Sequence, residues 1–174
     1  IDNKSAFHAQ KEQDMTALKM RLNSASDEYE KLEIYGQLFN GYLHYQADSS
    51  LHYIDEKIRL LSTMERADLN AEVLINRAEV LGVMGMYTEA LEQLEQVNSR
   101  TLDLKALNYY YRVYCACYGW LADYTSSRAV KQKYRQQANV YRDSILSVIS
   151  QDLDKDIVQA ERYLMKGEGA KSIS

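Results

Sequence analysis

Apolar side chains recur at three- and four-residue steps through most of this chain, which is the spacing of one face of an α-helix. A clear example runs from Tyr29 to Tyr42, where Tyr35 and Phe39 continue the same face. Ser26 precedes this run and is predicted to be its N-cap. The full pattern predicts eight helices, over residues 5–22, 27–42, 48–61, 70–84, 88–97, 103–122, 126–148 and 154–166.

Residues that interrupt helices are scarce. The 174 residues include no proline and seven glycines, whereas average usage of about 5% would give roughly nine prolines. The chain is instead rich in Ala, Leu, Glu, Gln, Lys, Arg and Met, which favour helices. We therefore expect an all-α fold.

The joints between the predicted helices resemble one another. The segments ADSSLHYI (47–54), GMYTEALEQL (85–94) and ADYTSS (122–127) each place a possible N-cap before a small residue. Aligning Ser50, Ala90 and Ser127 gives intervals of 40 and 37 residues. Two-helix repeats of this length indicate an α-solenoid. We expect antiparallel helix pairs stacked in one domain over residues 1–174, with repeats at roughly 26–65, 70–99 and 103–150 and an incomplete one at 152–174.

The segment GMYTEALEQLEQV resembles the second half of a tetratricopeptide repeat. Gly85, Tyr87, Ala90 and Leu94 occupy the positions familiar from that repeat, although its usual closing proline is missing. The resemblance implies a tetratricopeptide-like solenoid, in which the first helix of each pair lines a concave surface.

A wider resemblance covers most of the chain. KEQDMTALKMRL, YQADSSLHYIDEKIRLLS, GMYTEAL, NYYYRVYCACYGWLADY and YRDSIL occur in this order. The order is similar to the N-terminal helical-repeat region of a family of bacterial membrane-anchored, helix-turn-helix-type transcriptional regulators. The resemblance implies a periplasmic, extracytoplasmic domain of an inner-membrane protein, followed by a transmembrane helix and a cytoplasmic DNA-binding portion. Because the chain opens with Ile1 rather than Met, we also expect a segment upstream of it.

Residues 108–124 hold six tyrosines, both cysteines and the single tryptophan. On a helix, two adjacent stripes are apolar, and we expect them to pack against neighbouring helices: Tyr111, Cys115, Tyr118, Ala122, and Tyr110, Tyr114, Cys117, Leu121, Tyr124. Cys115 and Cys117 point to nearly opposite sides, so we predict two free thiols that pack as small apolar side chains.

The remaining face of this helix mixes aromatic and charged side chains. In the tetratricopeptide-like register, equivalent faces occur on the helices at 27–42 and 70–84. Together they predict a groove for a protein or peptide, lined by Tyr35, Phe39, Tyr42, Glu72, Asn76, Glu79, Tyr109, Arg112 and Trp120. The alternative is a solvated surface that binds no partner.

Other chemistry is poorly supported. A net charge of −4 argues against direct nucleic-acid binding by this region. The sequence lacks a phosphate loop, a GxSxG motif and an HExxH motif, so we predict no enzyme activity and no cofactor. His44 and His52 flank a turn near Asp48, but a solvated pair is favoured over a metal site. The basic face at Arg128, Lys131, Arg135 and Arg142 is similarly assigned to solvent rather than to an acidic partner.

We therefore predict a non-enzymatic helical-repeat domain that binds a protein or peptide and belongs to a bacterial signalling protein. Membrane anchoring would come only through flanking segments, and oligomerisation stays open. The alternatives are a soluble cytoplasmic adaptor or scaffold of the same fold, and a carrier of a small ligand in a tyrosine-lined cavity. The last predicted helix lacks a partner helix, so we expect Ile157, Leu164 and Met165 to be exposed.

Overall fold

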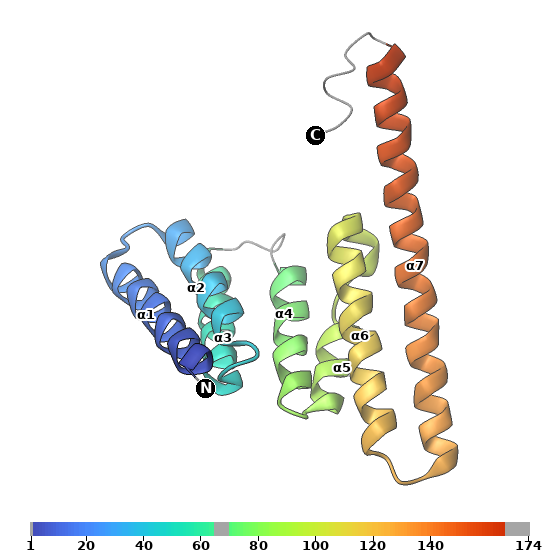
Figure 1. Ribbon diagram of the computed structural model, residues 1–174, viewed down its shortest axis with the longest axis horizontal. Coiled ribbons are helices and arrows are strands. Elements are labelled where there is room, and N and C mark those ends of the chain that lie inside the picture. The colour runs from blue at the N-terminus through green and yellow to red at the C-terminus, as the bar shows by residue number, and fades with distance from the viewer. Residues whose placement is uncertain (1, 65–69, 166–174) are drawn as a thin grey trace. The chain divides into compact units, whose positions relative to one another are not determined.

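The computed structural model describes the backbone of residues 2–64 and 70–165. Side chains are described for residues 9–64, 71–153 and 156. All regular structure in these ranges is helical, as predicted (Figure 1). The elements are α1 (Asp2–Ser24), α2 (Glu28–Tyr42), α3 (Ala47–Thr63), α4 (Asn70–Val83), α5 (Tyr87–Glu95), the 3₁₀ turn η2 (Ser99–Thr101), α6 (Leu104–Tyr124) and α7 (Arg128–Met165). No helix within these ranges combines the length and apolarity needed to span a membrane.

The chain divides into two compact units, which we call the N-terminal unit (residues 1–98) and the C-terminal unit (residues 99–174). In the N-terminal unit, successive helices from α1 to α5 pack against one another. One apolar cluster joins α2, α3 and α4 and includes Phe39, Ile54 and Val80. A second cluster joins α1 to α2 through Met15, Ile34, Leu38 and Tyr42.

Small residues allow the helices of each N-terminal pair to approach closely. Ser50 is fully buried on α3, and its hydroxyl donates a 2.9 Å hydrogen bond to the carbonyl of Phe39 on α2. This bond satisfies a polar atom that would otherwise be costly to bury. Ala90 occupies the corresponding fourth position of α5 and is also fully buried. The predicted equivalence of Ser50 and Ala90 is therefore confirmed.

The turn between α4 and α5 has the conformation expected of the tetratricopeptide-like segment. Gly85 has a φ of 84°, in the left-handed region that glycine adopts at little cost. The next residue, Met86, donates its N–H to the carbonyl of Leu81 across the end of α4, a bond typical of helix C-termini. Leu94, four residues after Ala90, is fully buried.

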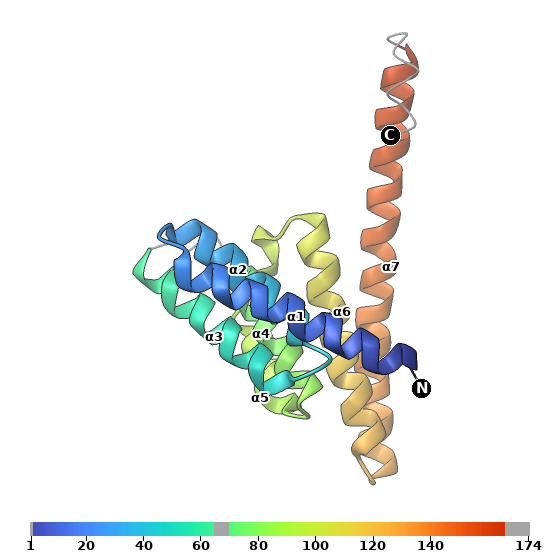
Figure 2. The ribbon, with the colours of Figure 1, turned by 60° about the vertical axis from the view of Figure 1, so that its left-hand side comes forward.

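The C-terminal unit is an antiparallel pair of unequal helices, α6 and α7. Asp103 caps α6 by accepting a hydrogen bond from the N–H of Ala106. At about 1.5 Å per residue, the 21 residues of α6 span roughly 32 Å and the 38 residues of α7 roughly 57 Å. The C-terminal end of α7 therefore extends well beyond α6 (Figure 2).

Tyrosine rings fill the contact between α6 and α7, which we call the tyrosine seam: Tyr111, Tyr114, Tyr118, Tyr134 and Tyr141. Tyr141 is central to it. Its ring lies parallel to that of Tyr114, at 4.4 Å between centroids, and also stacks on Tyr118 at 5.8 Å. Ala138 lies beside these rings, where its carbonyl accepts a hydrogen bond from the Cys115 thiol. The predicted packing role of most of these tyrosines is confirmed.

Several sequence-based details were wrong. The predicted helices at 126–148 and 154–166 form one continuous helix, because Ser150, Gln151 and Asp152 face solvent within α7 instead of ending it. Asp27, not Ser26, caps α2. Tyr124 is 77% exposed because it is the last residue of α6. Ser127 lies just before α7 and is exposed, so it does not correspond to Ser50.

Candidate protein-binding groove

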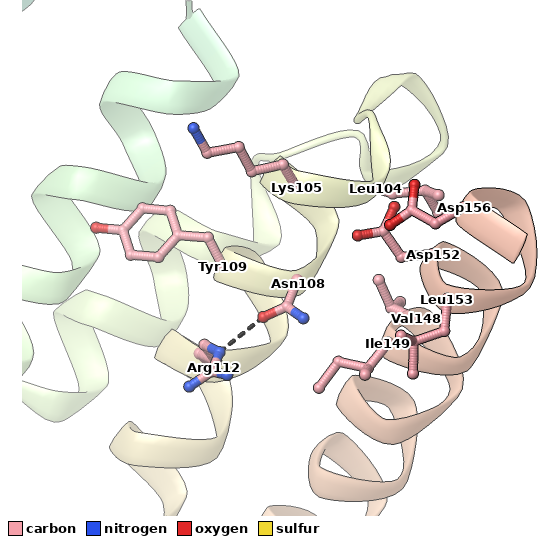
Figure 3. A pocket seen from close by; sticks show the side chains of 10 residues that line it. All are labelled: Leu104, Lys105, Asn108, Tyr109, Arg112, Val148, Ile149, Asp152, Leu153 and Asp156. Carbon is pink, nitrogen blue, oxygen red and sulfur yellow. Dashed lines mark hydrogen bonds between the residues drawn. The ribbon is translucent and has the colours of Figure 1, made fainter. Parts of the chain in front are cut away.

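A groove with a volume of about 540 Å³ lies between the first half of α6 and the middle of α7 (Figure 3). We call it the α6/α7 groove. Two similar sets of residues line it, each following one face of its helix: Leu104, Lys105, Asn108, Tyr109 and Arg112 on α6, and Val148, Ile149, Asp152, Leu153 and Asp156 on α7.

The sizes of the facing side chains explain where the groove opens. Within the seam, stacked rings such as Tyr114 and Tyr141 set the separation of α6 and α7. Towards the start of α6, smaller residues take their place, including Asn108 on α6 and Val148 on α7. Val148 is buried, and its side chain forms part of the floor. Smaller side chains between helices held at this separation leave open volume.

The two rims of the groove carry opposite charges. Lys105 and Arg112 project from α6, and Asp152 and Asp156 come from α7. The Arg112 Nε donates a 2.7 Å hydrogen bond to the amide oxygen of Asn108, which orients the guanidinium along α6. All four charged side chains are exposed. The groove therefore presents both positive and negative side chains that a partner could reach from solvent.

Apolar side chains lie between these rims. Ile149 and Leu153 are 36% and 58% exposed and, four residues apart on α7, are neighbours on one face of the helix. Exposed apolar surface rimmed by polar groups is typical of a protein-binding site. The site is chemically suited to an amphipathic segment with apolar anchors and charged flanks.

Two of the sequence-predicted site residues, Tyr109 and Arg112, line this groove. Trp120 lies two turns further along α6, is half-buried and does not line it. The sequence analysis placed no residue of α7 in a binding groove, so it missed the contribution of this helix. The repeated spacing of 104, 105, 108, 109, 112 and of 148, 149, 152, 153, 156 is a signal that could have pointed to two facing surfaces.

The predicted aromatic groove surface on α2 was wrong at Phe39 and Tyr42. Each is 1% exposed, since α3 covers Phe39 and α1 covers Tyr42. The Tyr42 ring stacks on Tyr53 at 5.8 Å, and the ammonium of Lys19 lies 5.3 Å from its centroid. Tyr35 is half-buried, and this burial raises the pKa of its hydroxyl.

The candidate residues on α4 differ in accessibility. Asn76 is buried, so its assignment to an open surface was wrong; it lies between the buried residues Ile75 and Ala78 along the helix. Glu72 is exposed and forms a 3.5 Å ion pair with Lys57 of α3. Glu79 is half-buried. A function of Tyr35, Glu72 or Glu79 in binding stays a prediction.

The cysteines and histidines have structural surroundings. Both thiols are free, Cys117 is buried and Cys115 is half-buried, within the unbroken helix α6. His44 and His52 are exposed, and His52 packs edge-on against Tyr53. No three His, Cys, Asp or Glu side chains converge on a possible metal position in the described part of the chain. The side chains of Ile157, Leu164 and Met165, predicted to be exposed, lie outside the described residues.

Comparison with known proteins identifies a family for the whole chain. A family model described as the SusR N-terminal TPR domain, where TPR denotes the tetratricopeptide repeat, matches residues 1–174. A search of curated proteins gave no match, and neither did a search of solved structures. The match agrees with the paired helices and with the α4/α5 turn described above.

Proposed function

This chain belongs to the SusR N-terminal TPR domain family, and on that premise we propose that its α6/α7 groove binds a segment of another protein. Tetratricopeptide-repeat domains are helical-repeat modules of protein–protein interaction. The observation that carries the proposal is the exposed apolar surface at Ile149 and Leu153 beside oppositely charged rims. The role is binding rather than catalysis, because the groove offers anchors and charges that fix a partner's position.

The proposed ligand is an amphipathic segment rather than a small molecule enclosed by tyrosines. In the seam, the Tyr114 and Tyr141 rings are in direct stacking contact, so they fill the space that a carrier would need for its ligand. The groove is open to solvent, and Tyr109 is the one tyrosine among the ten residues that line it. These contacts favour a protein-binding module over a small-ligand carrier.

The wider proposal places the domain in a bacterial membrane-anchored transcriptional regulator, as its extracytoplasmic sensor or interaction part. The support is the family membership and the ordered segments from KEQDMTALKMRL to YRDSIL. A cytoplasmic adaptor is the competing possibility. A surface cysteine introduced at Ser127 of the full-length protein can be labelled with a membrane-impermeant thiol reagent. This labelling distinguishes the extracytoplasmic location from the cytoplasmic one. Labelling in intact spheroplasts supports the proposal, whereas labelling only after lysis supports the adaptor.

Affinity capture from a native extract, followed by titration of the captured protein, tests the groove. Arg112→Ala and Asp152→Asn each remove one charge from opposite rims, and we expect each to weaken binding by about tenfold or more. Lys133→Ala is the matched control, since Lys133 is an exposed cation that does not line the groove. If both groove variants bind every captured protein as tightly as the wild type, the groove is an ordinary solvated surface.

A further inference from the structure

A stripe of five exposed side chains runs along α7 beside the groove. Arg142, Leu146, Ile149, Leu153 and Asp156 follow one another at steps of four, three, four and three residues. This alternation is the heptad spacing with which one helix packs along another. We call these five residues the α7 stripe.

The apolar part of the stripe has no covering helix among the described residues. Leu146 and Leu153 are each 58% exposed. The adjacent face of α7, with Tyr141 and Val148, already packs towards α6. The stripe is therefore a second apolar face of α7, and burying it against a partner would remove three large aliphatic side chains from water.

The stripe has a symmetrical order, with Ile149 at its centre, a leucine on each side and opposite charges at the ends. When two such stripes meet antiparallel near Ile149, the arginine end of each faces the aspartate end of the other. Arg142 of one copy then comes within about one helical turn, roughly 5 Å along the axis, of Asp156 of the other copy. Because the pairing is isologous, the same contact forms twice.

We propose that the α7 stripe is a self-association surface, on which a second copy of this chain docks with its α7 antiparallel to the first. The charge distribution along the whole helix supports this orientation. Residues 128–142 contain five basic residues and no acidic one, whereas residues 143–156 contain four aspartates and one lysine. An antiparallel arrangement brings the basic half of each helix towards the acidic half of the other. A parallel arrangement would place like charges together.

This inference rests on the proposed function, because Ile149, Leu153 and Asp156 belong to both the α7 stripe and the α6/α7 groove. Figure 3 shows these three side chains on the α7 side of the groove, so a docked second copy would cover that side. Self-association and the binding of another protein would therefore use the same three residues of α7.

Sedimentation velocity on the full chain, at protein concentrations up to about 100 µM, measures the association. We expect a concentration-dependent dimer for the wild type. Leu153→Asp puts a charge in the apolar centre at two symmetrical positions and should weaken the dimer by at least about 100-fold. Val140→Asp is the matched control, because Val140 is 55% exposed on α7 but lies off the stripe. It should leave the dimer unchanged.

Charge exchange tests the antiparallel register. Arg142→Asp alone should weaken the dimer by about tenfold or more, because two arginine–aspartate contacts become repulsive. Asp156→Arg alone should do the same. The double variant Arg142→Asp/Asp156→Arg restores both contacts and should recover most of the affinity. Failure of the double variant to recover would overturn the antiparallel arrangement.

The outcomes separate this inference from the groove proposal. A wild type that stays monomeric throughout the concentration series overturns the self-association proposal, while loss of a captured protein in Arg112→Ala would still support the groove. Equal weakening by Val140→Asp and Leu153→Asp also overturns it, since the effect would not be specific to the stripe. The opposite result is also informative. If the dimer responds to charge exchange as expected, but the groove variants capture the same proteins as the wild type, self-association stands and the proposal of a different partner protein fails.

Discussion

The two units join antiparallel helices with different side chains. In the N-terminal unit, aliphatic residues such as Ile54 and Leu61 and small residues such as Ala90 are fully or almost fully buried. In the C-terminal unit, the contact between α6 and α7 consists of stacked tyrosines, and Tyr141 at its centre is only half-buried. The same architecture is thus compatible with an almost fully buried, mainly aliphatic core that also contains Phe39, or with a partly solvated aromatic seam.

The difference bears on where a binding surface can form. Small residues draw α3 onto α2, and the side chains between them are almost completely buried. Stacked tyrosines fill the contact between α6 and α7, and shorter side chains at one end of that contact leave the α6/α7 groove. The α6/α7 groove thus lies in the unit whose helix contact is less completely buried.

The largest expected effect contrasts core with seam. Phe39→Ala should lower the free energy of unfolding by about 3–5 kcal/mol, because its ring is almost fully buried. Tyr141→Ala should cost about 2–3 kcal/mol, because a half-buried ring loses several aromatic contacts. Tyr141→Phe keeps the ring and should stay within about 1 kcal/mol of the wild type. Denaturant unfolding followed by circular dichroism measures all three, and a Tyr141→Ala cost equal to that of Phe39→Ala would remove the contrast.

An intermediate effect tests the repeat register. Enlarging the buried small residues by Ala90→Leu or Ser50→Val should destabilise the chain by about 1–3 kcal/mol, since the helices have no room for added methyl groups. Ser127→Val should change stability by less than about 0.5 kcal/mol, because Ser127 is exposed. Thermal melts of the three variants decide this. A large cost at Ser127 would restore the equivalence that the sequence indicated.

The smallest expected effect compares one glycine from each unit. Gly85→Ala should cost about 1 kcal/mol through its positive φ alone, because an added Cβ meets nothing closer than the Tyr87 hydroxyl at 3.9 Å. Gly119→Ala should stabilise by about 0.5–1 kcal/mol, since Gly119 lies inside α6 and no atom lies within 4 Å of the new Cβ. Opposite signs in parallel melts are the expected result, and equal signs would contradict the assignment of one glycine to a turn and the other to a helix.

Periodicity in the sequence predicted the helices well because local spacing determines which residues share a face. The α4/α5 pair followed from Gly85, Ala90 and Leu94, whose roles depend on neighbours in the sequence. The break predicted near residue 150 did not occur, because Ser and Asp also occur on solvated helix surfaces.

The candidate site was harder to predict because it depends on which helices meet. The spacing of Phe39 and Tyr42 along α2 does not reveal whether their face is exposed or buried. Only the placement of α1 and α3 shows that both side chains are covered. The α6/α7 groove joins residues about 40 positions apart, at a register set by the stacking of Tyr114 on Tyr141. That register cannot be read from the spacing within either helix.

The most direct test of the account compares Arg112→Ala with Tyr114→Ala in denaturant unfolding followed by Trp120 fluorescence, which reports on the C-terminal unit. Tyr114 is buried in the seam, so its truncation should cost about 3–5 kcal/mol. Arg112 is exposed on the groove rim and should cost less than about 0.5 kcal/mol while weakening partner binding. Equal destabilisation by the two variants would contradict the claim that α6 packs through its tyrosines and binds through its charged rim.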